Sequence, residues 1–415
     1  MKKEIISFAL SISVIGSVLL SSGCKNQTLE SSSSEKTSSH ISSITVEQSE
    51  SGISTEDVTD AGTEPITNIT DEARALIPNF DLKYFLTSLD EKELESVIAI
   101  YDCMLKFDDK CTLPQYIDPQ RLFDIITVMK AECPELFHVD FDKLISSDSS
   151  QFAELSLKYR VSSSEYTKMR SDAKDIIDSI VAAAKQMPSD SEIEKYVFDH
   201  LSFNCTYDTD SESSDTAYGA IKEKSASSIG ISLAMKWIME ECGIQCLCIT
   251  ADRSESDIPH AWNIIELDKV FYTLDLTPSI KYNDTSTTLS DKIIYFAFNV
   301  SDKWTENNYF IHNGFYRVAN IPECKTDDEG YFARLGCFIK SGGDPTDTMS
   351  VQLRNVVGSG GGNVYIQFEN NSDLKSFVDG ISAKLISWFD ENNMTYSSIR
   401  YEIFEYNVCI IYVNE

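Results

Sequence analysis

A long apolar helix followed by three short apolar runs is the feature that most limits how this chain can fold. From Ser225 to Gly243 apolar residues recur at helical spacing, and Gly243 suits the left-handed cap at a helix C-terminus. Three apolar runs of strand length follow it: Ile244–Thr250, His260–Leu267 and Phe271–Leu276. This order predicts one long helix and then a strand-rich segment that ends in a hairpin.

Segments on both sides of this region also have regular patterns. Before it, helical periodicity indicates amphipathic helices within Leu82–Lys110 and Gln120–Met129 and a helix at Tyr166–Ala184. Between the last two, Phe152–Tyr159 alternates in the manner of a strand. Another helix is expected after Pro188, where Ser189 and Glu192 have the spacing of a capping box.

The C-terminal part has its own arrangement. Val364–Phe368 alternates as a strand, and Ser372 is expected to cap a helix whose apolar residues continue to Phe389. Two more strands, Tyr401–Tyr406 and Val408–Val413, complete a small α/β unit. We therefore expect three folded regions: a mainly helical one (72–185), a core (186–328) and the α/β unit (329–415).

The first residues predict an export signal. Lys2 and Lys3 precede an apolar and small-residue run from Ile5 to Leu20, which is roughly 16 residues long and shorter than the about 20 of a spanning helix. The run closes on residues 21–24, which resemble a lipobox although a serine stands at position 21, where a leucine is usual. We expect 1–23 to be a lipoprotein signal peptide and Cys24 to carry the lipid anchor on the bacterial cell membrane. Ordinary secretion and a retained membrane anchor are the alternatives.

The segment from residue 24 to residue 71 is expected to be a disordered tether, because Ser, Thr and Glu dominate it and large apolar residues are almost absent. The whole chain carries a formal net charge of -31. This charge argues against nucleic acid as a partner, because phosphates would be repelled.

Ten of the eleven cysteines remain once Cys24 is assigned to the lipid. An exported chain permits disulfides, and two pairs are close enough in sequence to form one: Cys103 with Cys111, and Cys324 with Cys337. No CxxC pair occurs, so neither a zinc site nor a cofactor is expected.

Several short motifs occur in an order that resembles a known family. They are Ala217–Ile221, the start of the long helix, Gly243–Cys246, Pro259–Asn263 and Tyr272–Thr277. Over roughly residues 193–279 this order is similar to bacterial transglutaminase-like proteins, which are related to papain. Pro134–Phe137 resembles the N-terminal region of such lipoproteins. The resemblance implies an α+β fold in which a helix packs on an antiparallel sheet.

The family resemblance assigns a catalytic triad to this region. A thiol at the helix N-terminus is ionised by the helix amides and an adjacent imidazole, and an aspartate orients that imidazole. His260 and Asp275 match the second and third positions. The nucleophile position falls on Ser228, and no cysteine lies between Cys205 and Cys242. Tyr218 and Trp262 are the expected cleft residues.

Ser228 leaves three readings open. In the first, the domain is a non-catalytic descendant that binds an extracellular peptide, protein, cell-wall or glycan ligand. In the second, it is a hydrolase or acyl transferase that uses Ser228, His260 and Asp275. In the third, the site is rebuilt from other residues. A hydroxyl is a far weaker acid than a thiol, which favours the first reading. Cys205 is a weak candidate for a substitute nucleophile, because it lies outside the helix end that would activate a thiol. Without the neighbouring motif residues, His260 would be interpreted as a core histidine.

Overall fold

The computed structural model describes residues 68–149, 152–253, 256–285, 295–306 and 309–414. The predicted signal peptide, Cys24 and nearly all of the predicted tether lie outside these residues. Residues 69–71, which the sequence assigned to the tether, instead form the first turn of helix α1 (Ile69–Leu76). The side chain of Asn68 caps this turn by accepting a hydrogen bond from the Thr70 amide at 3.1 Å.

Contacts divide the chain into two compact units. The described part of the larger unit comprises residues 68–285 and 309–325, and that of the smaller unit comprises 295–306 and 326–414. Both contain helices and strands, so the α+β class is confirmed. Separate folding of regions 72–185 and 186–328 stays a prediction.

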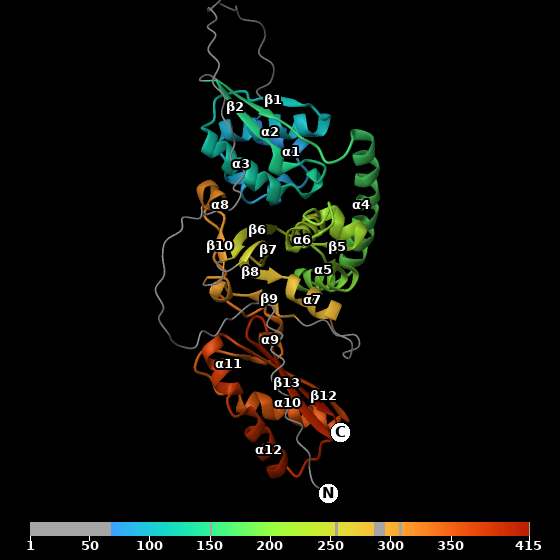
Figure 1. Ribbon diagram of the computed structural model, residues 1–415, viewed down its shortest axis with the longest axis vertical. Helices are drawn as coiled ribbons and strands as arrows, with labels where there is room; N and C mark the ends of the chain where they lie inside the picture. The colour runs from blue at the N-terminus through green and yellow to red at the C-terminus, as the bar shows by residue number, and fades with distance from the viewer. Residues whose placement is uncertain (1–67, 150–151, 254–255, 286–294, 307–308, 415) are drawn as a thin grey trace, which may run out of the picture. The chain divides into compact units, whose positions relative to one another are not determined.

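The first part of the larger unit combines helices with a small sheet (Figure 1). Its main helices are α2 (Glu91–Lys106), begun by a capping box of Asp90 and Glu93, and α3 (Pro119–Glu132). Its strands lie in the order β1-β3-β2. They are β1 (Lys110–Thr112), β2 (Ile145–Ser149) and β3 (Phe152–Ser156). Short turns of 3-10 helix connect these elements: η1 (Phe80–Leu82), η2 (Leu86–Ser88), η3 (Pro134–Leu136) and η4 (Phe141–Lys143).

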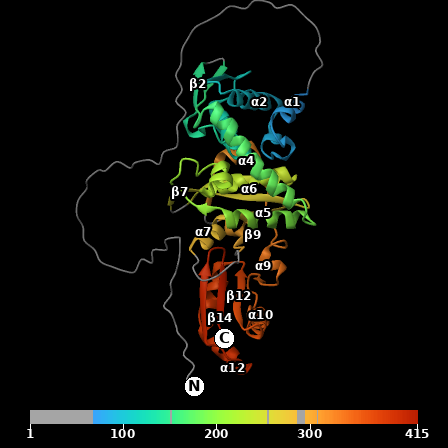
Figure 2. The same ribbon diagram turned by 90° about the vertical axis from the view of Figure 1, so that its right-hand side faces the viewer.

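Three helices follow and lie beside one another (Figure 2). They are α4 (Ser163–Ala184), α5 (Asp190–Asn204) and α6 (Ser228–Cys242). Ser189 caps α5 as predicted, and Gly243 ends α6 with a φ of 92°. Helix α6 begins three residues later than predicted, because strand β5 (Ser225–Ala226) pairs with β4 (Thr206–Tyr207). A single π-helical turn, η5 (Gly219–Glu223), lies between these two strands in the sequence.

An antiparallel sheet packs against α6. Its strands β10 (Tyr309–Ile311), β6 (Cys246–Arg253), β7 (Ser256–Leu267) and β8 (Val270–Asp275) are neighbours in that order. Asp268 and Lys269 both have positive φ, 49° and 68°, as a two-residue hairpin turn with right-handed strand twist requires. The predicted helix and hairpin are therefore both present. Two short helices complete the unit: α7 (Thr277–Thr285) and α8 (Asn313–Val318).

The smaller unit is built on a sheet with the order β11-β12-β14-β13. Its strands are β9 (Ala297–Val300), which lies outside this sheet, β11 (Phe338–Ile339), β12 (Gly361–Phe368), β13 (Ser398–Phe404) and β14 (Val408–Asn414). Its helices are η6 (Asp302–Trp304), α9 (Tyr331–Arg334), α10 (Thr346–Gly358), α11 (Asn371–Val378) and α12 (Ile381–Glu391). Alternate residues of β12 and β14 form one apolar core with α10, α11 and α12.

The prediction of one helix capped by Ser372 is wrong in two respects. Asn370, not Ser372, is the cap, and its side chain accepts a hydrogen bond from the Asp373 amide at 2.8 Å. The helix is also split into α11 and α12 at Gly380, whose φ of 83° is left-handed. The apolar spacing continues across the break because both helices cover the same sheet face.

Candidate active site

Ser228 is the first residue of α6, and it is almost completely buried. Its exposed fraction is 1%, and its Oγ accepts a hydrogen bond from the backbone N–H of Ala261 at 3.2 Å. The hydroxyl therefore faces β7 next to His260. The structure thus brings the helix start and the histidine strand together, as the motif order requires.

A loop packs closely over the first turn of α6. The Ser227 amide donates to the Ser214 carbonyl at 2.8 Å, and a Cβ on Gly230 would collide with the carbonyl oxygens of Ser214 and Thr216. Only glycine fits at that position without moving the loop.

His260 and Asp275 form the expected acid–base pair. His260 Nε2 lies 2.7 Å from Asp275 Oδ2, and the other carboxylate oxygen accepts the Thr277 amide at 2.9 Å. Asn263 on β7 lies opposite Leu274 on β8, so alternation places His260 and Asp275 on the same face of the hairpin. The Asp275 side chain is 1% exposed and that of His260 is 13% exposed. The buried carboxylate thus orients an imidazole that reaches solvent.

The hydrogen bond to Asp275 determines which imidazole nitrogen is available. With Nε2 donating its proton to the carboxylate, Nδ1 is left as the nitrogen that can accept a proton. Within the described residues, no hydrogen bond joins the Ser228 hydroxyl to the His260 ring. The three triad positions are therefore neighbours, but only two of them are connected.

Two aromatic rings lie against the imidazole. Tyr309 stacks on His260 with a centroid separation of 5.0 Å, and Trp262 does so at 6.1 Å. Trp262 is 2% exposed and acts as a packing residue. Sequence reasoning missed Tyr309, because it lies 49 residues after His260 and reaches it only through the pairing of β10 with β6.

Two other motif residues have structural contacts. Tyr218 is 8% exposed and stacks on Phe137 at 5.2 Å, so it connects the Ala217–Ile221 motif to the Pro134–Phe137 segment. Asn263 donates from Nδ2 to the carbonyls of Ser232 on α6, at 2.9 Å, and Leu247 on β6, at 3.1 Å. Asn263 thereby ties the helix to the sheet beneath His260.

The described cysteines are all free thiols, so the two pairs that are close enough in sequence to bond, Cys103 with Cys111 and Cys324 with Cys337, are not bonded in this structure. Burial and a hydrogen bond to Cys103 raise the pKa of the Cys111 thiol. Within the described part of the chain, no thiol makes a hydrogen bond to His260, and no group of three or more His, Cys, Asp or Glu residues is placed to hold a metal. Cys205 ends α5, and its Sγ lies 3.5 Å from the Thr206 carbonyl.

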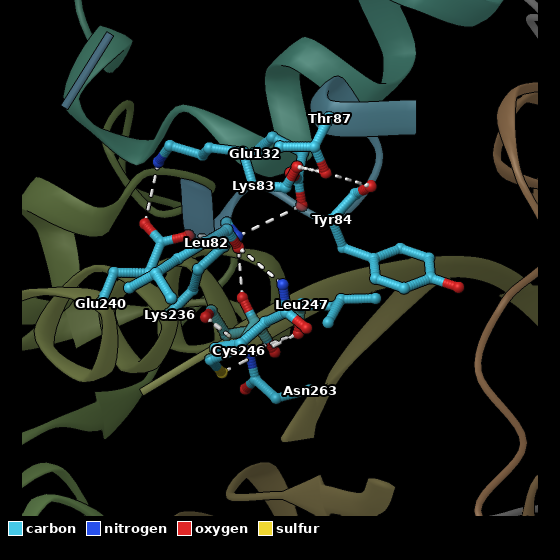
Figure 3. Close-up of polar contacts among 12 residues, drawn as sticks. Leu82, Lys83, Tyr84, Thr87, Glu132, Lys236, Glu240, Cys246, Leu247 and Asn263 are labelled. Carbon is cyan, nitrogen blue, oxygen red and sulfur yellow. Dashed lines mark hydrogen bonds and ion pairs between the residues drawn. The ribbon is translucent and has the colours of Figure 1, made fainter. Parts of the chain in front are cut away.

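A second polar cluster lies further along α6, and the sequence analysis did not identify it (Figure 3). Lys236 Nζ contacts Glu240 Oε1 at 2.6 Å, Glu132 Oε1 at 3.2 Å and the Cys246 carbonyl at 2.7 Å. Lys83 Nζ contacts Glu240 Oε2 at 2.8 Å, and Glu135 Oε2 lies 3.9 Å away. All these charged side chains are at most 2% exposed. We call these five residues (Lys83, Glu132, Glu135, Lys236 and Glu240) the buried charge network.

The lysines of this network stay charged. Burial opposes the charge on Lys236, but Glu132 and Glu240 outweigh it and raise its pKa to about 12. Burial likewise opposes the charge on Lys83, whose pKa Glu135 and Glu240 raise. The network connects α3, η1 and η3 with α6. The signal in the sequence was a Lys and a Glu four residues apart, Lys236 and Glu240, on a largely apolar helix.

Comparisons with known proteins add little to this geometry. No family model matches the chain, and no curated protein matches it. Three chains of solved structures match, among them a crystal structure of a TGase with 14% sequence identity and a TM-score of 0.23. That match covers 37% of this chain and 46% of the other, so this chain spans about half of its length. A TM-score this low does not establish a common fold.

Proposed function

We propose that residues 193–279 form a transglutaminase-like domain that has lost acyl-transfer chemistry and serves as a binding or scaffolding module at the cell surface. The observation that carries the proposal is the environment of Ser228. Its hydroxyl accepts the Ala261 amide, is 1% exposed and makes no hydrogen bond to His260 among the described residues. A nucleophile must instead give its proton to a base and reach a carbonyl carbon.

Physical chemistry supports the same conclusion. A helix N-terminus and an imidazole suffice to ionise a thiol, whose ordinary pKa is about 8.5. An alcohol stays protonated in the same field, so Ser228 requires direct proton removal by His260 during attack. The preserved His260–Asp275 pair then serves as a hydrogen-bonded structure that lines a ligand site.

The decisive experiment uses a fluorescent primary amine and a glutamine peptide as acyl donor. We expect no amine incorporation by the wild-type chain. We expect the Ser228→Cys variant to react with iodoacetamide faster than the wild type, because it returns a thiol to the helix start beside His260. The Ser227→Cys variant is the matched control, since it places a thiol one residue earlier, outside the helix.

Two of the native cysteines add little background in this labelling. Burial raises the pKa of Cys242 and of Cys337 to about 11, so both are protonated at neutral pH. Amine incorporation by the wild type that is lost in Ser228→Ala would overturn the proposal.

The second candidate function is a hydrolase or acyl transferase that uses Ser228, His260 and Asp275. The bond from His260 Nε2 to Asp275 favours it, because it leaves Nδ1 as a base on the side of the ring away from the carboxylate. This function requires a rotation of the Ser228 side chain away from the Ala261 amide. Serine-directed fluorophosphonate labelling of the wild type, absent in Ser228→Ala, would establish it.

We also propose that the domain is exported and held outside the cytoplasm by a lipid on Cys24. The support is the N-terminal motif alone. No described helix has the length and apolar character needed to span a bilayer. Mass spectrometry of the mature N-terminus should find a diacylated Cys24, and Cys24→Ala should move the protein from the membrane fraction to the soluble fraction. An unmodified Cys24 in mature protein would contradict the assignment.

A further inference from the structure

The main sheet of the smaller unit has two edges, and they differ in length. One edge is β11, which is two residues long. The other is β13, a seven-residue strand that pairs with β14 alone among the described strands. A long edge strand presents backbone donors and acceptors to any second strand that can align with it. The outer edge of β13 is therefore a candidate interaction surface.

Strand β13 lacks the features that usually protect such an edge. Native proteins block edge pairing with prolines, bulges, lysines or very short strands. The sequence of β13 contains no proline, glycine or lysine, and its register with β14 runs through all seven residue pairs without a shift. Ile399 and Tyr401 pack against the apolar core, and alternation places Ile403 on the same face, where it is still 39% exposed.

The sequence of β13 is complementary to itself when a second copy runs in the opposite direction. In an antiparallel pair centred on Tyr401, Arg400 lies opposite the partner's Glu402, and Ile399 lies opposite the partner's Ile403. Opposite charges and apolar side chains at facing positions both stabilise a pair of strands. Each of these contacts occurs twice, because a two-fold axis relates the copies.

The same side chains disfavour the neighbouring registers. A pair centred on Arg400 places two guanidinium groups opposite each other, and a pair centred on Glu402 does the same with two carboxylates. Like charges at facing positions destabilise strand pairing. A register centred between two residues would put the helix-covered face of one sheet beside the other face of its partner. The register centred on Tyr401 avoids both problems.

The two charges are already held in position within one copy. The Arg400 guanidinium pairs with Glu402, and their side chains are 44% and 37% exposed. Arg400 also lies over the Tyr412 ring, 3.8 Å from its centroid, and the Tyr412 hydroxyl donates to Glu402 at 3.1 Å. In the pair, the four charges of two copies form one cluster in which each guanidinium has two carboxylate neighbours.

We propose that the chain forms a two-fold dimer in which the β13 strands of two copies pair antiparallel about Tyr401 and join their sheets. The surface lies on the smaller unit, so the dimer does not depend on the proposed role of Ser228. A two-fold contact is closed, so association stops at two copies. One pair of seven-residue strands is a small interface, and we expect a dissociation constant on the order of 10 µM.

The test is sedimentation equilibrium of the full chain over roughly 1–200 µM, a range that brackets the expected constant. A Cys24→Ala background keeps the proposed lipid from contributing to association. Glu402→Arg and Arg400→Glu each place like charges at facing positions, and each should weaken the dimer roughly tenfold. An equimolar mixture of these two variants should restore it, because the positive strand then faces the negative one.

Two further variants serve as controls. The double variant Arg400→Glu with Glu402→Arg exchanges the charges and should dimerise like the wild type. Lys375→Glu, on the exposed surface of α11, changes the net charge as much as Arg400→Glu does and should leave the dimer unchanged. The mixture separates association from misfolding, since a variant that has lost its fold cannot restore a dimer with its counterpart.

Four results would each overturn the proposal. They are a wild-type chain that stays monomeric at the highest concentration, a species larger than the dimer, a dimer that Glu402→Arg leaves intact, and a mixture of the two variants that stays monomeric. A dimer that survives Glu402→Arg would assign the contact to a different face of the molecule.

Discussion

Helix α6 carries two polar clusters that differ in how completely their groups are satisfied. At its start, Ser228 accepts one backbone amide, and the nearby His260 keeps Nδ1 available and its side chain 13% exposed. Two turns later, Lys236 has three oxygen partners and is fully buried. Both clusters involve ionisable side chains on or beside the same helix.

This difference distinguishes a structural cluster from a candidate functional one. Burying a charge costs several kcal/mol unless nearly every donor is used, so the buried charge network persists only because its members hold one another. It specifies how α3, η1 and η3 meet α6. The His260 side chain is partly exposed, so its burial costs less free energy. Its Nδ1 nitrogen also stays available, which a binding or reactive group needs.

The largest effect should come from breaking the network. Lys236→Met removes the ammonium that contacts Glu132 and Glu240, which leaves the buried Glu132 without its cation and Glu240 with Lys83 alone. We expect a loss of about 3–5 kcal/mol in the free energy of unfolding, measured by urea denaturation. The double variant Lys236→Met with Glu132→Leu is the control and should recover part of the loss, because it also removes the carboxylate that the single variant leaves without a cation. A loss below about 1 kcal/mol would mean that the network is not structural.

The next effect concerns alkaline pH. The pKa of Lys236 is about 12 in the folded chain against 10.5 for the free side chain, so its contribution to stability is complete below about pH 10.5 and is lost as the pH rises through about 12. The difference in stability between wild type and Lys236→Met should shrink by about 2 kcal/mol over this window. A constant difference would contradict the raised pKa.

A smaller effect is expected at the hairpin. Asp275 accepts hydrogen bonds from His260 and from the Thr277 amide, and an asparagine there has one carbonyl oxygen for these two donors. Asp275→Asn should therefore cost about 1–2 kcal/mol in thermal unfolding. In the Ser228→Cys background it should also slow iodoacetamide labelling, because the imidazole loses its orienting carboxylate. Unchanged labelling would mean that the orientation of His260 does not influence the reactivity of a thiol at position 228.

The smallest effect should follow from Ser228→Ala. The Ala261 amide loses its acceptor, which costs about 1 kcal/mol, and no turnover is lost because none is expected. The matched comparison is Ser232→Ala, one turn later on the same helix and 2% exposed. A much larger loss for Ser228→Ala, or loss of a measurable activity, would remove the distinction between the two clusters.

Local sequence patterns predicted the helices and strands correctly where a single periodicity continues along the segment. The helix pattern that ends at Gly243, the cap at Ser189 and the Asp268–Lys269 turn depend on residues within a few positions, and all three are present. The error at Gly380 arose because two helices that cover one sheet face keep the same apolar spacing across a break.

By itself the sequence determined the order of the elements, the mixed α+β class and the residue types at the three motif positions. Only the tertiary structure decided that Ser228 bonds the Ala261 amide, that Tyr309 stacks on His260, and that two lysines and three glutamates share one buried cluster. The physical reason is separation along the chain. Hydrogen-bond partners such as Lys83 and Glu240 lie 157 residues apart, and which polar groups meet depends on how whole elements pack.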